Sequence, residues 1–536
     1  MAFCNSFKKY FTTLVASLFS LVLFAQMPTN GIDVQHYNFS IRLNDSNNII
    51  RGNAVITTKF TKQVNEVVFD LANKNSDGKG IIVTSVLKDG KPIDFSQDLQ
   101  HLVIRDKAFK SEEKKYDISY EGIPADGLII SNNKFGQRVF FGDNWPNRAH
   151  NWLPCNDHLS DKATVDFIVT APDHYQVISN GKKIEETNLP GHLKLTHWKE
   201  SVALPTKVMV IGVANFAVNY VGDVDCVPVS SWIFPEEKDS GFAHYATAKN
   251  ILKWYKNHIA PYPFEKLANV QSKTIFGGME NAGCIFYFEN SVNSKTLESL
   301  TAHEIAHQWF GDNATEKDWP HLWLSEGFAT YMTDLYFENK YGTDTLKSML
   351  RMQRNKILHF FTEHKTPVVD TTEKNNLMKL LNANSYEKGA WVLHMLRRKV
   401  GDTLFWKSIR EYYRIYKGSN ANTRDLQKIF ENVTHQNLQD FFDQWLFRAG
   451  QPMLNISWTY NVSKKMLSLK IEQTQANLFE FPLQIAFKEN NQTIIKTFEI
   501  KNKVTQKNIS LAMKPTEIIL DPNVNLLFSA TLKEEK

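Results

Sequence analysis

The 536-residue chain contains few cysteines: there are four, and Cys4 precedes an N-terminal apolar run. The other three, Cys155, Cys226 and Cys284, allow at most one internal disulfide. This excludes a small domain held together by several disulfides. We expect these cysteines to act as small buried apolar residues, and a single disulfide with one thiol left over is the alternative.

Long apolar runs are also scarce. The run at residues 10–24 is interrupted by threonine and serine, and it is short for a membrane span, which needs about 20 residues. It follows Lys8-Lys9 and precedes Ala25-Gln26, which is the order of regions in a secretory signal. We therefore expect residues 1–26 to be a signal peptide and the protein to be exported to the periplasm or the cell exterior. Beyond that segment we expect no stable membrane span.

A large excess of one charge is absent, because 62 basic residues stand against 57 acidic ones. A net charge of +5 on a chain of this length gives no support for a nucleic-acid partner or an anionic membrane. Internal repeats and low-complexity tracts are also missing. The hydrophobic content of 42% is ordinary for a globular protein that is long enough for several domains.

What the chain does contain is a change of periodicity at two places. From about residue 30, apolar residues alternate with polar ones and Asp-Gly or Asn-Gly turns recur, which predicts strands up to about residue 215. Helical patterns begin near Ser240, first at residues 243–259, and continue to Phe447 around an extended run at 268–276. Alternation returns after Gly450. We expect an all-β N-terminal domain, a mixed domain and a C-terminal Ig-like β-sandwich, with boundaries at 27–215, 216–450 and 451–536.

The segment Thr301-Ala-His-Glu-Ile-Ala-His-Gln-Trp-Phe-Gly311 carries the first chemical signal. We expect a helix from about Ser294, a suitable N-cap, to Gly311. His303 and His307 are four residues apart and therefore share one helix face, where two imidazoles can bind one metal ion. Glu304 lies beside them and is not needed as a ligand.

Glu326 supplies the third ligand. It follows His307 by 19 positions and begins a second helix, expected at about residues 325–340, so that a helix–loop–helix brings its carboxylate to the imidazoles. Two histidines and one glutamate leave a position for water in a catalytic zinc site. Glu304 is then the general base that takes a proton from the water and passes it to the leaving amine. We expect one Zn²⁺ per chain.

These residues resemble those of the zinc aminopeptidases of the gluzincin clan, the family of aminopeptidase N and leukotriene hydrolase. The segment Phe276-Gly-Gly-Met-Glu-Asn-Ala-Gly283 is similar to the exopeptidase motif of that family, which lies on an edge strand. The resemblance extends over nearly the whole chain after the leader, through Trp152-Leu-Pro-Cys-Asn-Asp157, Tyr262-Pro-Phe-Glu-Lys266 and Asp521-Pro-Asn523. It implies a thermolysin-like fold for the mixed domain.

The resemblance also implies roles for particular residues. Glu280 would bind the free α-ammonium of a peptide, which fixes the cut after the first residue. Its neighbours Gly277, Gly278, Met279 and Asn281 would bind the substrate backbone. Tyr386, in Asn384-Ser-Tyr-Glu-Lys-Gly-Ala390, would donate a hydrogen bond to the oxyanion, since a phenol stays protonated at neutral pH.

The chain departs from the family at two points. Trp145 occupies the position where relatives place a second amine-binding glutamine or glutamate. Asp143, two residues earlier, either substitutes for it or caps the turn at residues 143–146. Many relatives also have a large helical C-terminal domain over the active site, whereas the residues after Gly450 are patterned as strands. We therefore expect a short form with a more open cleft.

The resulting hypothesis is an exported metalloaminopeptidase that hydrolyses the first bond of peptides with a free N-terminus, acting as a monomer. A thermolysin-type endopeptidase would share the zinc ligands but would have no use for Glu280. A leukotriene-type epoxide hydrolase would have a helical C-terminal domain, and this chain has a strand pattern there instead. A non-catalytic zinc-containing protein that binds peptides would need neither Glu304 nor Tyr386.

Overall fold

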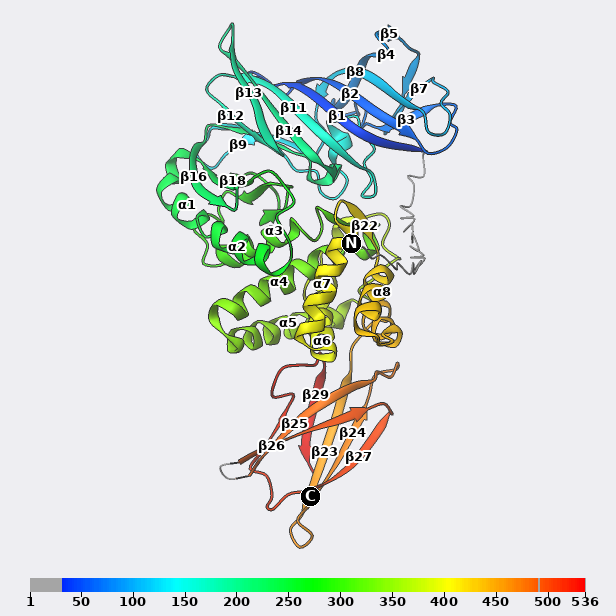
Figure 1. Cartoon of the computed structure of the whole chain (residues 1–536), viewed down its shortest axis with the longest axis vertical. Coiled ribbons are helices and arrows are strands. Elements are labelled where there is room, and N and C mark those ends of the chain that lie inside the picture. The colour runs from blue at the N-terminus through cyan, green and yellow to red at the C-terminus, as the bar shows by residue number, and fades with distance from the viewer. Residues whose placement is uncertain (1–30, 490–491, 536) are drawn as a thin grey trace, which may run out of the picture.

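The computed structural model describes residues 31–489 and 492–535. Within them the chain is arranged in three parts along its long axis: strands at the top, a helix-rich middle and a smaller pair of sheets at the bottom (Figure 1). This confirms the predicted multidomain α+β fold. The expected signal peptide, residues 1–26, lies outside the described residues.

The N-terminal part is built on an eight-stranded sheet in the order β13-β14-β11-β1-β2-β8-β4-β5, in which only the β1–β11 pair is parallel. The alternation seen in the sequence places Phe39 and Ile41 of β1 in the core, because one face of this sheet is covered. Its strands are β1 (Ile32–Arg42), β2 (Ile50–Phe60), β4 (Gly80–Lys88), β5 (Lys91–Pro92), β8 (Glu113–Ile123), β11 (Lys162–Pro172), β13 (Lys182–Leu189) and β14 (Leu193–Pro205).

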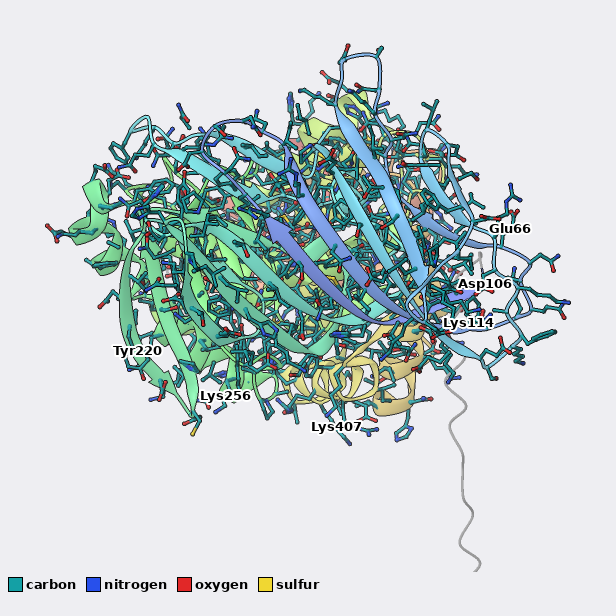
Figure 2. The ribbon with its side chains drawn as sticks, turned by 90° about the horizontal axis from the view of Figure 1, so that it is seen from above. Glu66, Asp106, Lys114, Tyr220, Lys256 and Lys407 are labelled. Carbon is teal, nitrogen blue, oxygen red and sulfur yellow. The ribbon has the colours of Figure 1, made fainter. Side chains whose placement is uncertain are left out.

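Two smaller sheets complete this part. One has the order β12-β15-β10-β9 and the other β3-β7-β6. Their strands are β3 (Val67–Asp70), β6 (Phe95–Gln97), β7 (His101–Ile104), β9 (Leu128–Asn132), β10 (Arg138–Gly142), β12 (Gln176–Ser179) and β15 (Ile211–Ala214). Figure 2 looks down on the N-terminal strands, with Asp106 and Lys114 at one end and Tyr220 of the next sheet at the other. Asp106 accepts hydrogen bonds from Lys88, Lys114 and Tyr116.

The central part begins with a mixed five-stranded sheet in the order β16-β17-β18-β20-β19. Its strands are β16 (Ala217–Val224), β17 (Val227–Ile233), β18 (Leu267–Ser272), β19 (Gly278–Met279) and β20 (Cys284–Phe288). β19 lies at the edge and pairs antiparallel with β20. A short pair, β21 (Ala314–Glu316) and β22 (Ser419–Ala421), joins two distant loops.

Helices make up the rest of the central part. They are α1 (Lys238–Tyr245), α2 (Ala248–His258), α3 (Leu297–His307), α4 (Trp323–Tyr341), α5 (Thr343–Glu363), α6 (Gly389–Val400), α7 (Asp402–Tyr416), α8 (Thr423–Thr434) and α9 (Gln439–Phe442). The π-helical turn η6 (Asn384–Lys388) leads into α6.

Two of the expected helices differ from those observed. The helix expected at 243–259 is divided into α1 and α2, because the Thr247 hydroxyl donates to the carbonyl of His244 at the junction. The helix expected at 294–311 is shorter, since α3 covers Leu297–His307. Ser294 forms a turn before the helix by accepting the backbone N–H of Thr296. At the other end, Asp312 N–H donates to the carbonyl of His307 and closes the helix into a turn.

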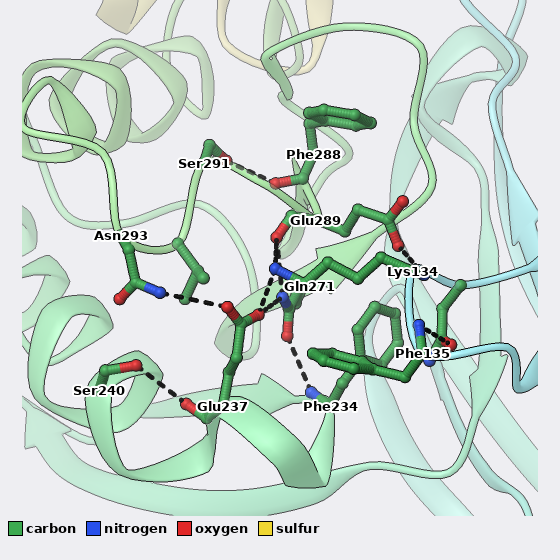
Figure 3. A network of polar contacts seen from close by, with 12 residues as sticks. Lys134, Phe135, Phe234, Glu237, Ser240, Gln271, Phe288, Glu289, Ser291 and Asn293 are labelled. Atoms are coloured by element: carbon green, nitrogen blue, oxygen red, sulfur yellow. Dashed lines mark hydrogen bonds and ion pairs between the residues drawn. The ribbon is translucent and has the colours of Figure 1, made fainter.

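A polar network joins the N-terminal and central parts (Figure 3). Lys134, in the turn between β9 and β10, lies 2.7 Å from the Glu237 carboxylate, and its backbone N–H donates to Glu289. Gln271 of β18 donates to Glu237 and to the carbonyl of Glu289. The network therefore couples the β9–β10 turn, at the edge of the four-stranded N-terminal sheet, to the sheet that carries β19.

The C-terminal part consists of two facing sheets, β27-β24-β23-β29 and β26-β25-β28. The strands are β23 (Met453–Asn461), β24 (Met466–Gln473), β25 (Phe481–Glu489), β26 (Gln492–Ile500), β27 (Val504–Ser510), β28 (Glu517–Leu520) and β29 (Ser529–Glu534). Arg354 of α5 donates to Asp521 and to the carbonyl of Leu526, and this contact holds the sandwich under the helices.

Two sequence expectations concern features of the whole chain. Among the described residues no helix combines the length and hydropathy that a membrane span requires. Cys155, Cys226 and Cys284 are all free; the first and last are buried and Cys226 is exposed. Burial raises the pKa of the Cys284 thiol to about 11, so this residue is a small apolar side chain and not a reactive thiolate.

Candidate active site and metal centre

The structure brings His303, His307 and Glu326 together at the centre of the molecule. Both histidines lie on α3, and Glu326 lies in the first turn of α4, which packs against α3. Glu326 Oε2 is 3.2 Å from Nε2 of each histidine, and the two Nε2 atoms are 3.0 Å apart. Within the described residues, this is the group of histidine, cysteine and carboxylate side chains that could hold a metal ion.

The spacing of these three atoms fits a tetrahedral metal site. Ligand atoms about 2.0–2.1 Å from a zinc ion at tetrahedral angles lie roughly 3.3 Å from one another. The second nitrogen of His307 is also engaged, since Nδ1 donates to the carbonyl of Phe310 at 3.1 Å and lies 3.0 Å from the Ser325 hydroxyl. These contacts orient the ring and leave Nε2 to face the other two ligands.

Burial and mutual attraction govern the charges of these ligands. Burial opposes the ionised form of Glu326, but the adjacent His307 and His303 lower its pKa below the usual range. Burial likewise opposes a charged His307. The attraction of the Glu326 carboxylate is larger than this effect of burial and raises the pKa of His307 to about 10. A concentrated negative charge that draws a proton to its neighbour also favours a bound cation.

Glu304 lies next to the ligands without contributing to their triangle. Its side chain is 4% exposed, and burial raises its pKa well above the usual range. Gly278 of β19 faces it so closely that a Cβ at position 278 would lie 2.4 Å from Glu304 Oε1. Only glycine at this position leaves room for the carboxylate beside the edge strand.

The glycine-rich segment forms the edge of the sheet beside α3, as the resemblance implied. Gly277, Gly278, Met279 and Glu280 line the cleft, and Glu280 Oε1 has no hydrogen-bond partner among the described residues. Asn281 was also expected to contact the substrate. It is fully buried and is not among the residues that line the cleft, because the chain turns into the sheet core after Glu280.

Tyr386 lies in η6 and faces the metal ligands from the opposite wall. Its ring stacks on that of His303 with a centroid distance of 5.8 Å and an interplanar angle of 14°. Burial raises the pKa of its phenol well above the usual range, which keeps the hydroxyl protonated as a donor.

The cleft has a volume of about 760 Å³ and is lined by residues between Trp145 and Glu387. No described residue of the C-terminal sheets contributes to it. Besides the residues named above, its walls include Phe276, Ser291, Thr296, Ser299, Leu300, Thr330, Thr333, Asp334, Met349, Met352, Gln353, Lys356 and Leu381.

Asp143 is not placed in this cleft, which corrects its assignment as a substrate-binding residue. It is fully buried, lies 3.0 Å from Arg148 and accepts the backbone N–H of Ile275. Its carboxylate therefore anchors the segment that leads into β19. Trp145 does line the cleft, and its ring packs edge-on against Phe276 at 5.7 Å.

Sequence reasoning also missed Gln308, which follows His307. Its side-chain amide donates to the carbonyl of Glu280 at 2.6 Å and to Asp312, and its oxygen accepts from Gly283 N–H and from the Tyr262 hydroxyl. Gln308 thus ties α3 to the loop that carries Glu280. Its place directly after the metal-binding helix, as a polar residue among apolar ones, could have indicated a buried hydrogen-bonding role, since buried polar side chains need partners.

Comparison with known proteins gives a consistent picture. The family model "Peptidase family M1 domain" matches residues 243–445, and "Peptidase M1 N-terminal domain" matches residues 33–208. "Probable aminopeptidase 2" of Sulfurisphaera tokodaii is 26% identical over 446 residues, which are 80% of this chain and 55% of that protein. "Aminopeptidase M1-C" of Oryza sativa is 30% identical over 350 residues, which are 61% of this chain and 38% of that protein.

Solved structures of similar proteins have the same fold over most of this chain. The M1 zinc metallopeptidase of Deinococcus radiodurans aligns with a TM-score of 0.65 and 25% identity over 78% of this chain and 93% of that one. Aminopeptidase A of Legionella pneumophila, solved with aspartic acid, aligns with a TM-score of 0.82 over 95% of this chain and 60% of that one. At 16% identity it shows the fold alone. The chain spans about half the length, or less, of the curated relatives named here. With both family domains matched in sequence order and the ligand triangle on α3 and α4, the chain belongs to peptidase family M1.

Proposed function

We propose that this protein is a zinc-dependent aminopeptidase that removes the first residue of peptides with a free N-terminus. The observation that carries the proposal is the placement of Glu280, with an unpartnered carboxylate oxygen, in the same cleft as the His303, His307 and Glu326 triangle. An enzyme that only cut within chains would not need a buried carboxylate at that end of the cleft. The peptide substrate and the single zinc ion follow from the same arrangement.

Each residue then has a defined task. When bound, Zn²⁺ supplies Lewis-acid chemistry, since it polarises a carbonyl and lowers the pKa of a water. Glu280 accepts hydrogen bonds from the α-ammonium group and sets how far the substrate enters. Glu304 takes the proton of the attacking water and passes it to the nitrogen of the leaving peptide. The Tyr386 hydroxyl donates a hydrogen bond to the oxygen on which negative charge develops.

A panel of fluorogenic aminoacyl amides, each with a free or acetylated N-terminus, tests this function with and without a zinc chelator. We expect hydrolysis of the free forms, loss of activity with the chelator and recovery on adding zinc. Equal cleavage of acetylated peptides would indicate an endopeptidase instead. Binding of peptides by the zinc-loaded protein with no turnover would indicate a non-catalytic role.

We also propose that the protein is exported and acts as a monomer. Export is supported by Lys8-Lys9, the apolar run at 10–24 and Ala25. N-terminal sequencing of the protein from its own cells should begin near residue 27, and a sequence that begins at Met1 would contradict export. Size-exclusion chromatography with light scattering measures the oligomeric state, and a mass of twice the chain would contradict the monomer.

A further inference from the structure

One buried carboxylate in the cleft has no part in the chemistry described above. Asp334 lies on α4, eight residues after Glu326, and is fully buried while lining the same cleft. Its two oxygens accept from the side-chain amide of Gln353 at 3.0 and 2.9 Å. Within the described residues it has no ion pair with a basic side chain. The charged groups that act on it most strongly, Glu387 and Glu338, are acidic.

Gln353, on α5, also has an unsatisfied hydrogen-bonding group. It is 8% exposed and lines the cleft, and its Oε1 has no hydrogen-bond partner among the described residues. Buried acceptors without a donor are rare in folded proteins, because each one loses its hydrogen bonds to water. Asp334 and Gln353 together therefore place several oxygen acceptors at one point of the cleft wall, and the Gln353 oxygen among them has no donor within the described residues.

The position of this pair along the cleft follows from how α3 and α4 pack. Early in α4, Glu326 meets His303 and His307; late in α4, the Tyr336 hydroxyl donates to Glu298 at the start of α3. The two helices therefore run antiparallel. Glu280 is tied to the opposite end of α3, through its carbonyl and Gln308. Asp334 and Glu280 thus lie on opposite sides of the metal ligands.

This geometry tells which part of a substrate meets Asp334. With the N-terminus at Glu280 and the scissile carbonyl at the metal ligands, the residue after the cut extends towards Thr330 and Asp334. Eight residues of helix span about 12 Å, a distance that a long side chain and its backbone can cover. Leu300, Met349 and Met352 supply apolar and adaptable walls along the way.

We propose that Asp334 and Gln353 form a subsite for the side chain of a lysine or arginine at the second position of the substrate. This inference rests on the proposed aminopeptidase function. A lysine or arginine stem packs on the leucine and methionine walls, while its terminal N–H groups reach both acceptors. At the rim, Lys356 is neutralised by Glu387 at 2.9 Å, so the net charge of the subsite is negative once Asp334 is ionised.

The protonation of Asp334 links the subsite to pH. Burial raises the pKa of Asp334 to about 8, so the unliganded enzyme holds it as a neutral acid at pH 7. A cation that enters favours the carboxylate and displaces the proton to solvent. The charged groups that act on it are Glu338 of α4 and Glu387 of η6, and Lys356 of α5 pairs with Glu387 at the rim. Preference for a basic second residue should therefore increase from pH 6.5 to pH 8.5.

The test compares Ala-Lys-Ala with Ala-norleucine-Ala, whose second side chain has the stem of lysine without its charge. At pH 8 we expect the wild type to favour the lysine peptide in kcat/KM by about tenfold, a common size for pocket discrimination. Asp334→Asn should bring this ratio close to one. Asp344→Asn removes the same charge from the exposed start of α5 and should keep the wild-type ratio.

Three results would overturn the subsite: a wild-type ratio close to one, a ratio that persists in Asp334→Asn, or a ratio that Asp344→Asn lowers equally. Because the readout is a ratio, a general loss of activity in the variant does not imitate the effect. Failure of the proposed function is distinguishable, since the wild type would then release alanine from neither peptide.

Discussion

At the scale of residues, three of the four buried carboxylates that line the cleft differ clearly in what surrounds them. Glu326 is held ionised by two imidazoles, Glu304 is raised in pKa by burial beside Gly278, and Asp334 has only an amide for a partner. In the functions proposed above, the same functional group thus serves as a ligand, a base and a substrate contact. The environment of each side chain, and not its type, assigns these tasks.

The proposed role of Glu304 as the base leads to a first prediction. Glu304→Gln keeps the size of the side chain and removes the group that accepts the proton, while the ligand triangle is unchanged. We expect kcat to fall by about 10³-fold with full zinc content, measured by metal analysis of the purified variant. A variant that retains most of its kcat would show that another group is the base.

Asp334 leads to a second prediction, on stability. Its folded pKa of about 8 lies above the ordinary 3.8, so the unfolded chain ionises first as the pH rises. Between about pH 4 and pH 8 the unfolded chain gains the free energy of ionising Asp334 while the folded chain does not. The free energy of unfolding of the wild type therefore falls over this range. Asp334→Asn removes the penalty, and its new amide can donate to Gln353 Oε1. We expect its Tm to exceed that of the wild type by on the order of 2 °C at pH 8.

The advantage of Asp334→Asn should shrink when scanning calorimetry is repeated at pH 5. Asp344→Asn, which changes an exposed carboxylate, should show no such trend. A Tm difference that is constant between pH 5 and pH 8 would contradict the burial argument.

At the scale of elements, the site depends on how closely α4 approaches η6 and α6. Gly327, directly after Glu326, lies where an added Cβ would be 2.9 Å from the Cα of Gly389 and 3.1 Å from the carbonyl oxygen of Ser385. This contact sets the separation between the ligand on α4 and Tyr386 on η6. The two glycines therefore position Glu326 and Tyr386, which come from two elements in close contact.

Gly327→Ala should separate these elements. Backbone atoms cannot move aside as a flexible side chain can, so we expect a loss of about 1–3 kcal/mol in stability. We also expect kcat to fall at least tenfold, because Tyr386 would move away from the ligands. Thermal unfolding and steady-state kinetics measure both effects. Wild-type values for both would contradict the close approach.

At the scale of the whole molecule, buried charges join the N-terminal and central parts behind the cleft. Lys207 of the N-terminal part and Glu316 of β21 form an ion pair at 2.7 Å, with both side chains almost completely buried. Nearby, the ammonium group of Lys162 donates to the carbonyls of Asp312 and Asn313. These contacts hold the N-terminal part against the loop that follows α3, and the Lys134 network holds it against the sheet that carries β19.

Removing one partner of the buried pair should therefore be costly. Lys207→Met leaves the buried Glu316 carboxylate without its ion-pair partner, and we expect a loss of about 3–5 kcal/mol. The double variant Lys207→Met/Glu316→Leu should recover much of it, because no unpaired charge remains. Denaturant unfolding of both variants tests this, and equal destabilisation of the single and double variants would contradict it.

The sequence by itself determined the features that depend on local geometry. His303 and His307 share a face because a helix has a fixed period, and the strands around Phe39 and Ile41 alternate because side chains on a strand point to opposite faces. The group of metal ligands and the three-part fold could therefore be predicted, the base stays a prediction, and the resemblance to a family added Glu280 and Tyr386 as candidates.

Tertiary structure alone decided which residues in loops and on neighbouring helices face the cleft. Asp143 and Trp145 are two residues apart, yet one is buried against Arg148 and the other lines the cleft. Asp334 and Gln353 meet because α4 and α5 pack together, and Gln308 reaches Glu280 across a gap of 28 residues. The ends of α3 also depend on hydrogen bonds in the adjoining turns, from Thr296 N–H to the Ser294 side chain and from Asp312 N–H to the His307 carbonyl. Packing and hydrogen bonds between distant segments fix these orientations, and no local period encodes them.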